Sequence, residues 1–191
     1  MRNSSFVLGG VVALVSLAAS QSPPSSPVSS QVPVGPAHRD TVFITKSELD
    51  KAATVRASGA TTGLASLGAV RAGDDRINVD VLQRSGPREE TPVSHKIVPE
   101  IYYILEGGGE IETGGEIPNP QPMTTPSGEP VNPANIGPSI RGEKMIGGAT
   151  RHIAKGDVVM IPPNVPHRFK ALDGSITYIV VRVNPGYEKG K

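Results

Sequence analysis

Two histidines and one glutamate are the residues of this chain whose types and spacing could bind a metal ion. His95 lies five residues before Glu100, and His167 follows later in the chain, directly after a proline-bounded bend at residues 162–166. Two imidazoles and one carboxylate on one face form a facial ligand set for a divalent transition metal and leave other coordination positions open. The sequence therefore predicts a metal centre, provided that the fold brings these three side chains together.

The first of the two segments is a β-rich run over residues 100–105, Glu-Ile-Tyr-Tyr-Ile-Leu. Because side chains alternate along a strand, an inward Glu100 places Tyr102 and Ile104 on the same inner face. A carboxylate among apolar interior positions is costly unless it is paired or binds a cation. Tyr102 is then a candidate catalytic acid, base or hydrogen-bond donor to a substrate. It can equally be a core aromatic residue whose hydroxyl finds a partner.

The second segment consists of a turn at Gly156–Asp157, a short apolar strand over residues 158–161 and the bend that leads to His167. Asp157 is expected to stabilise its own turn. The alternative for His95 and His167 is that each is a buried, hydrogen-bonded histidine in a barrel without metal.

The first segment resembles the first sequence motif of the cupin superfamily. That motif runs Gly, five residues, His-x-His, three or four residues, Glu, six residues, Gly, and it is matched here by His95, Glu100 and Gly107. Val93 stands where the motif has its first histidine, and Gly86 lies one residue too far upstream. The resemblance thus implies three protein ligands rather than four.

The second segment resembles the second cupin motif, which runs Gly, five residues, Pro-x-Gly, two residues, His, three residues, Asn. Gly156, Pro162 and His167 match this pattern. Asn164 replaces the internal glycine, a mild change because asparagine tolerates left-handed backbone geometry. Ala171 replaces the final asparagine.

Together the two motifs and the strands between them cover residues 75–184. The resemblance implies an all-β fold, an antiparallel jelly-roll barrel that is often a homodimer. The implied ligands of a divalent metal ion (Fe, Mn, Ni or Zn) are His95, Glu100 and His167. The missing histidine at position 93 either opens a coordination position for a substrate or marks a barrel that binds ligands without metal. His152 is a candidate replacement for it.

The composition excludes several classes of protein. The 191 residues include 19 Lys and Arg against 18 Asp and Glu, and no cysteine. A net charge of +1 supplies no excess of cations to neutralise phosphates, which argues against nucleic-acid binding. Without cysteine there is no disulfide framework, thiolate metal site or cysteine nucleophile. Motifs of nucleotide-binding loops, zinc proteases and serine hydrolases are also missing from the sequence. The cupin resemblance implies a small molecule as the ligand or substrate.

Residues 1–20 have the features of a secretory signal peptide. Arg2 precedes an apolar stretch from Phe6 to Ala19, which is shorter than the roughly 20 residues of a membrane-spanning helix. An uncleaved membrane anchor is the alternative. Residues 21–37 are rich in Pro and Ser and are expected to form an extended linker. The sequence therefore predicts a periplasmic or secreted protein, without a membrane span after cleavage, whose single barrel domain covers residues 38–191.

Patterning within this domain predicts one helix and many short strands. Thr45 and Glu48 fit a capping box that opens a short helix through about residue 53, outside the barrel. Residues 64–70 and 77–81 are expected strands. The glycines at 107–109 suggest a hairpin turn, and Asp173–Gly174 is the strongest hairpin signal in the chain.

Residues 114–142 interrupt the strand pattern with seven prolines, which should prevent a regular ladder. A long insertion of this kind is either an ordered flap over the barrel mouth or a floppy loop. Near the C-terminus, Tyr178 and Arg182 share a strand face. Arg182 could bind a carboxylate of the substrate, or it could be a solvated charge on the outer face.

The sequence thus predicts an exported metal-binding cupin that acts as a metal-dependent enzyme on a small polar molecule. Relatives catalyse oxygenation, decarboxylation, isomerisation and lyase reactions, so the fold does not select one. The alternative is a non-catalytic cupin with a degenerate metal site that binds a sugar-like small ligand. A structural or oligomerising cell-envelope protein is a third possibility, supported only by the linker.

Overall fold

The computed structural model describes residues 35–54, 62–86 and 89–189. The expected signal peptide, residues 1–20, and most of the expected linker lie outside these ranges. All described residues belong to one compact unit. Within the described ranges, no helix has both the length and the apolar character needed to cross a membrane.

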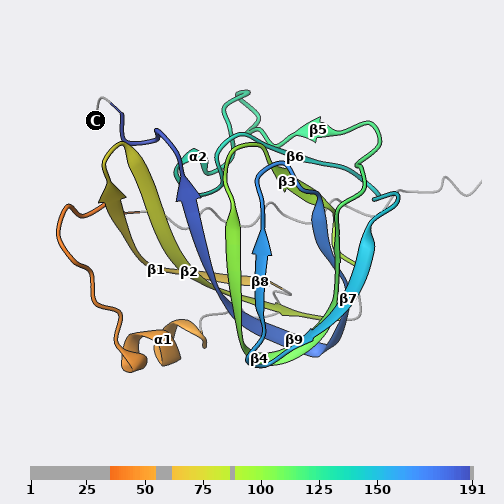
Figure 1. Cartoon of the computed structure of the whole chain (residues 1–191), viewed down its shortest axis with the longest axis horizontal. Helices are drawn as coiled ribbons and strands as arrows, with labels where there is room; N and C mark the ends of the chain where they lie inside the picture. The colour runs from red at the N-terminus through yellow and green to blue at the C-terminus, as the bar shows by residue number, and fades with distance from the viewer. Residues whose placement is uncertain (1–34, 55–61, 87–88, 190–191) are drawn as a thin grey trace, which may run out of the picture. The chain divides into compact units, whose positions relative to one another are not determined.

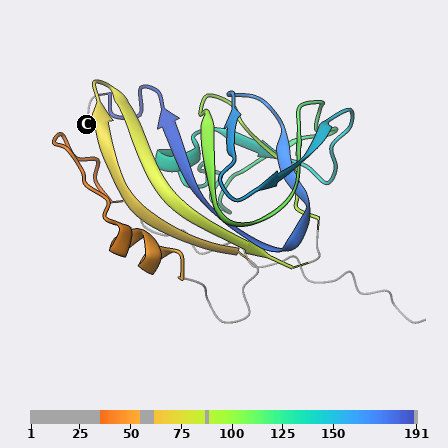
Figure 2. The ribbon, with the colours of Figure 1, turned by 60° about the horizontal axis from the view of Figure 1, so that its bottom comes forward.

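A short helix, α1 (Lys46–Ala52), precedes the strands, as the sequence predicts. Its capping box is complete: the Thr45 hydroxyl accepts a bond from the Glu48 amide, and the Glu48 carboxylate accepts one from the Thr45 amide at 2.8 Å. Both bonds satisfy amides at the helix start that lack intrahelical partners. Figures 1 and 2 show α1 beside β1 (Thr62–Ala72), outside the barrel strands.

The rest of the described chain is mostly antiparallel β-structure (Figure 1). The long strands after β1 are β2 (Asp75–Ser85), β4 (Glu100–Thr113) and β9 (His167–Asn184). The short strands are β3 (Val93–His95), β5 (Gln121–Pro122), β6 (Ser139–Arg141), β7 (Ala149–Ala154) and β8 (Val158–Ile161). β4 and β9 pair along most of their lengths; β4 also pairs with β7 and β8, and β9 with β2 and β3. The predicted all-β antiparallel fold with a helix outside it is confirmed.

The glycine run at residues 107–109 does not form the predicted hairpin turn but lies inside β4. The strand continues through it with register shifts against β9. A Cβ added to Gly107 would lie 1.9 Å from the Ser175 carbonyl oxygen, and one added to Gly109 would lie 2.4 Å from the Ala171 carbonyl oxygen. The glycines therefore allow the backbone of β9 to approach closely where β4 is bulged. Glycine within a strand commonly serves a bulge or a close backbone contact of this kind rather than a turn.

Asp173–Gly174 is not a hairpin either, because it lies inside β9. The parts of β9 before and after it both pair with β4, with Leu172 and Ile176 opposite glycines of the run described above. Gly174 has a φ of 87°, which accommodates a local irregularity without reversing the chain. The long-range pairing with β4 outweighs the local turn preference.

The insertion at residues 114–142 contains β5, the short helix α2 (Pro133–Ile136) and β6. The expectation that its prolines prevent a ladder is wrong for β6, which pairs antiparallel with β3 and places Ser139 opposite His95. β6 begins directly after Pro138, so no proline lies within it, and on its other side it pairs with the two-residue strand β5, where Pro122 lies opposite Ile140.

The inner face of β4 follows the predicted alternation: Glu100, Tyr102 and Ile104 are buried, and Tyr103 is exposed. Apolar residues from β2, β4, β7, β8 and β9 fill the interior beyond Glu100. The members of this cluster are Leu82, Tyr102, Ile104, Ile111, Ile153, Ile161, Phe169, Ile176, Tyr178 and Val180. The polar side chains described next lie at the end of this core where β3 ends and β4 begins.

Candidate metal centre

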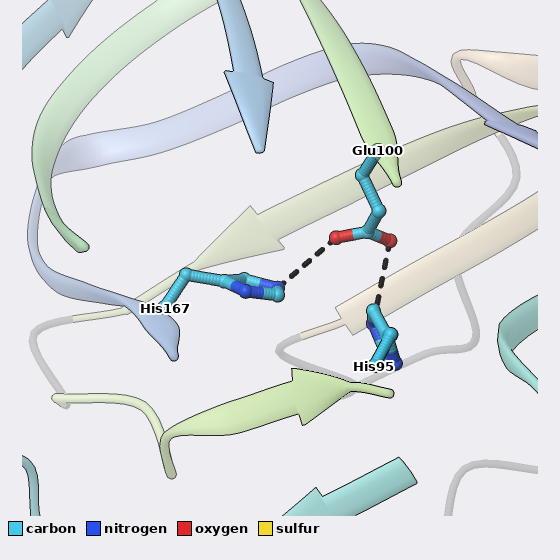
Figure 3. Close-up of side chains that lie close together, drawn as sticks. All are labelled: His95, Glu100 and His167. Atoms are coloured by element: carbon cyan, nitrogen blue, oxygen red, sulfur yellow. Dashed lines mark ion pairs between the residues drawn. The ribbon is translucent and has the colours of Figure 1, made fainter. Parts of the chain in front are cut away.

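Three strand ends position the predicted ligands (Figure 3). His95 is the last residue of β3, Glu100 the first of β4 and His167 the first of β9. Val93 on β3 pairs with His167 on β9, which brings the two histidine-bearing strands side by side. The two distant motifs thus meet at one end of the barrel.

The three side chains converge on one point and are almost completely buried. His95 Nε2 lies 3.4 Å from Glu100 Oε1, and His167 Nε2 lies 3.0 Å from Glu100 Oε2. Each residue offers one donor atom, and these atoms all lie within 4.8 Å of one another. The exposed fractions of the residues are 6, 1 and 5 % for His95, Glu100 and His167.

Hydrogen bonds on the far side of each imidazole fix which nitrogen faces Glu100. His167 Nδ1 lies 3.0 Å from the Val165 carbonyl oxygen, which can only accept, so Nδ1 carries the proton. His95 Nδ1 lies 2.8 Å from the Ser139 hydroxyl, whose own proton is donated to the Ile136 carbonyl at 2.9 Å. In the neutral form, both rings therefore direct an Nε2 lone pair at the carboxylate.

Two lone pairs that face carboxylate oxygens repel them unless a proton or a cation lies between. Burial lowers the pKa of His95, and the Glu100 charge offsets this only in part, so His95 is neutral at physiological pH. In metal sites, histidine ligands are oriented in the same way, by a hydrogen bond from the ring nitrogen that does not bind the metal. The donors, their orientation and their burial fit a divalent transition metal, and the group could hold one.

Glu100 stays ionised because a guanidinium lies beside it. Burial by itself would raise its pKa, but the Arg182 charge outweighs that effect and holds the pKa well below its usual range. Arg182 Nε donates to Oε1 at 2.5 Å, and the Tyr102 hydroxyl donates to Oε2 at 2.7 Å.

Arg182 continues the network away from the histidines. Its Nη1 donates to Asp80 Oδ2 at 2.9 Å, and Asp80 also accepts from Asn135 Nδ2 at 2.8 Å. Arg182 is therefore neither a solvated outer charge nor a free group for a substrate carboxylate, since it is buried and the carboxylates it binds belong to this chain. Arg182 shares its strand face with Tyr178 and Val180, which are fully buried, and this shared face is the sequence signal for an inward position.

Asp80 and Asn135 are the buried polar partners that sequence reasoning misses. Asp80 alternates with Val79 and Val81, and the apolar valines look like the inner face. The side that faces the barrel core is instead the other one, since Asp80 bonds Arg182 and Leu82 belongs to the core cluster, although Val81 is buried as well. The presence of Leu82 on that face is the only local hint.

Tyr102 lies between the candidate ligands and the apolar core. Its ring packs against Tyr178, with centroids 4.7 Å apart, and its hydroxyl bonds Glu100 as described above. Burial and then the Glu100 charge raise the pKa of Tyr102 well above its usual value, so the hydroxyl keeps its proton at neutral pH.

The structure also shows the positions of three other residues that the sequence analysis singled out. His152 does not replace the missing ligand, because its side chain is 57 % exposed and bonds Asp173 at 2.8 Å. It is opposite Glu110 in the ladder, on an outward position of β7. Asn164 has a φ of 63°, the left-handed geometry expected of it. Asp157 accepts a bond from the Ala154 amide, which stabilises its own turn as predicted.

A family described as the AraC-like ligand binding domain matches residues 141–187, which contain β7, β8, β9 and His167. In the structure this stretch packs with β4 in an antiparallel barrel, and its motif meets the other motif at the His95, Glu100 and His167 group. The fold is cupin-like. No curated protein matches the sequence of this chain.

Several solved structures are similar to this cupin-like chain. A conserved protein with a double-stranded β-helix domain from Klebsiella pneumoniae is 16% identical, with 77% of this chain and 92% of that chain covered and a TM-score of 0.44. The Bacillus halodurans protein BH2720 is 13% identical, with 78% and 86% covered and a TM-score of 0.47. A cupin 2 conserved barrel domain protein from Rhodopseudomonas palustris is 16% identical, with 69% and 68% covered and a TM-score of 0.41.

Proposed function

We propose that this protein is a metal-dependent enzyme that acts on a small polar molecule at a centre formed by His95, Glu100 and His167. The observation that carries the proposal is the position of the two Nε2 atoms, each of which faces an oxygen of one ionised carboxylate. When both rings are neutral, such an arrangement is repulsive without a cation and favourable with one. Fe, Mn, Ni and Zn all accept two imidazoles and a carboxylate.

A bound metal would act as a Lewis acid on a carbonyl or enolisable group, or would serve oxygen chemistry if it is iron. The chain's own residues prepare the site for this. Arg182 keeps Glu100 ionised, and the Tyr102 hydroxyl holds a proton 2.7 Å from Glu100 Oε2. Tyr102 is the candidate catalytic proton donor of the proposal. The apolar cluster behind the ligands favours a small substrate, because it fills the interior beyond them.

The second candidate is a non-catalytic cupin that binds a sugar-like small ligand with or without metal. The match to an AraC-like ligand binding domain favours it. So does the position of Tyr102, whose ring belongs to the buried core and whose hydroxyl is satisfied by Glu100. The two candidates share the centre and differ in whether a bound molecule is changed.

The proposal includes export to the periplasm or the medium, supported by the composition of residues 1–20. It also includes a homodimer. The support for the dimer is a group of exposed apolar side chains on the outer face of β4 and β8, where Tyr103 lies opposite Val158, and Met160 lies opposite the half-buried Ile101. Mass spectrometry of the mature N-terminus tests the first point, and light scattering of the purified protein tests the second.

Elemental analysis tests the metal centre directly. The purified full chain should contain close to one equivalent of a transition metal, and His167→Ala should lose it because one of three ligands is gone. His152→Ala is the matched control, since it removes a solvent-exposed histidine outside the group. Equal metal in all three proteins, or none in the unmodified chain, would remove the proposed centre.

A further inference from the structure

The insertion at residues 114–142 reaches the surroundings of the candidate ligands on two sides. On one side, Ser139 bonds His95. On the other, Asn135 bonds both members of the pair that supports Glu100, namely Arg182 and Asp80. No motif of the cupin resemblance includes this insertion, yet it provides a direct partner for His95 and a partner for the arginine that bonds Glu100.

The contact to His95 controls the ring's tautomer. The Ser139 hydroxyl donates to the carbonyls of Ile136 at 2.9 Å and Gly137 at 3.2 Å, both in the insertion, so its oxygen accepts from His95 Nδ1–H. That bond keeps the proton on Nδ1 and leaves Nε2 free to bind a metal. Without Ser139, the buried Nδ1 would lose its partner and the ring its orientation.

The contact to Glu100 is indirect. Asn135 is 1 % exposed; its Nδ2 donates to Asp80 Oδ2 at 2.8 Å, and its Oδ1 accepts from Arg182 Nη1 at 3.3 Å. Asp80 and Asn135 thereby hold the guanidinium in the position from which its Nε donates to Glu100. One amide side chain of the insertion satisfies an acceptor and a donor of this buried pair.

The barrel in turn holds the insertion through its backbone. Asn78 Nδ2 donates to the Ala134 carbonyl at 3.0 Å, and Asn184 Nδ2 donates to the Pro133 carbonyl at 2.7 Å. Both asparagines are buried on inner positions of β2 and β9. These bonds leave the short helix α2 docked with Asn135 directed at Arg182, so the insertion is a fixed part of the site's surroundings.

We propose that the insertion is the positioning element of the metal centre, and that Ser139 and Asn135 are its positioning residues. The inference rests on the proposed metal function and assigns its control to a segment outside the cupin motifs. Because a docked insertion favours metal binding, metal binding must favour the docked insertion by the same factor. Removal of either side chain should therefore weaken metal binding while all three ligands remain.

Ser139→Ala tests the contact to His95. Its matched control is Ser127→Ala, which makes the same change at an exposed serine of the same insertion. We expect the Kd for Zn²⁺, measured by competition with a chromophoric chelator, to rise roughly 10–100-fold in Ser139→Ala and to stay unchanged in Ser127→Ala. The ligand-field spectrum of bound Co²⁺ should also shift in Ser139→Ala, because a change in ligand orientation alters the geometry at the metal. Asn135→Ala should also weaken Zn²⁺ binding, through Arg182 and Glu100 rather than through His95.

Hydrogen exchange of the unmodified chain supplies a measurement that needs no variant. Zn²⁺ should slow the exchange of the Ile136 and Gly137 amides, which bond within the insertion, and leave the Ala53 amide of α1 unaffected. If the unmodified chain binds Zn²⁺ but neither these amides nor the Kd values of Ser139→Ala and Asn135→Ala respond, the positioning role is wrong and the metal centre stands. If the unmodified chain binds no metal, both proposals are wrong together.

Discussion

Two clusters inside the barrel contain the same trio of residue types, and only one of them could hold a metal. The first is Arg182 and Tyr102 around Glu100, described above. The second is Arg84, which donates from Nε to the Tyr178 hydroxyl at 2.8 Å and from Nη1 to Glu90 at 2.8 Å. In both, a guanidinium, a phenol and a carboxylate are joined by short hydrogen bonds.

The clusters differ in what faces the carboxylate and in how far water is excluded. Glu100 is 1 % exposed and has an imidazole nitrogen near each oxygen, whereas the side chain of Glu90 is 24 % exposed. Arg84 instead stacks on the rings of Phe169 and Tyr178, at 5.7 and 5.9 Å from their centroids. An Arg–Glu–Tyr set is therefore complete by itself in water-accessible surroundings. The two imidazoles and the burial are what make the first set need a cation.

The largest expected difference between the clusters comes from removing the carboxylate charge. Glu100→Gln should lower the free energy of unfolding by about 3–5 kcal/mol, because Arg182 loses a buried counter-charge. It should also abolish stoichiometric metal binding. Glu90→Gln should cost no more than about 1 kcal/mol, since that pair is partly exposed to water. Urea unfolding and metal analysis of both variants check this.

Equal losses of stability in Glu100→Gln and Glu90→Gln would contradict the distinction between the clusters. Retained metal in Glu100→Gln would contradict the assignment of Glu100 as a ligand. The urea m-value should match that of the unmodified protein in both variants, which excludes a change of the unfolded state as the cause.

The first cluster also shows which features of the site can be predicted from the sequence. The spacing of His95 and Glu100 and the alternation along residues 100–105 predict correctly which side chains point inward, because strand geometry is local. The same local rules mistake the glycines at 107–109 for a turn. There the deciding interaction is the close approach of β9, whose partner residues lie far along the sequence.

The hydrogen-bonded network that Arg182 forms behind Glu100 could not be predicted for the same reason. Arg182, Asp80 and Asn135 lie on two strands and an insertion, and each would be costly to bury alone. Their burial is tolerable only because the register of β2, β4 and β9 brings them within hydrogen-bond distance. A pattern read one strand at a time assigns such residues to the surface.

The second prediction concerns how protonation of His95, which faces the carboxylate of the first cluster, changes stability with pH. Burial lowers the pKa of His95, so the folded metal-free protein resists a proton that the unfolded chain accepts below about pH 6.5. The free energy of unfolding should therefore be fully retained above pH 6.5 and should fall as the pH drops towards 5. Urea unfolding at several pH values measures the slope.

His95→Gln should flatten this slope, because the titrating group is gone. His152→Gln is the matched control for the replacement of a histidine, since His152 is exposed outside the centre. Protons also compete with Zn²⁺ for the ligand nitrogens. As the pH falls, Zn²⁺ binding should therefore weaken by up to about tenfold per pH unit for each protonated ligand. A slope that is identical in all three proteins would show that His95 is not the group responsible.

The smallest expected effects separate the two tyrosines. Tyr102→Phe removes the donor to Glu100 Oε2 and should cost about 1 kcal/mol of stability, with a few-fold weaker Zn²⁺ binding. Tyr178→Phe removes the acceptor of Arg84 Nε and should cost a similar amount without changing Zn²⁺ binding. The stability values alone cannot distinguish the tyrosines, so the metal affinity decides.

Phenolate absorbance gives the same pair a second readout. Burial raises the pKa of Tyr178 to about 12, with Arg84 opposing that effect, whereas the pKa of Tyr102 is raised well above its usual value by burial and by the Glu100 charge. An absorbance step near pH 12 should therefore persist in Tyr102→Phe and disappear in Tyr178→Phe. If it disappears in Tyr102→Phe instead, the phenol beside Glu100 is the more easily ionised one, and the expected order of the two pKa values is wrong.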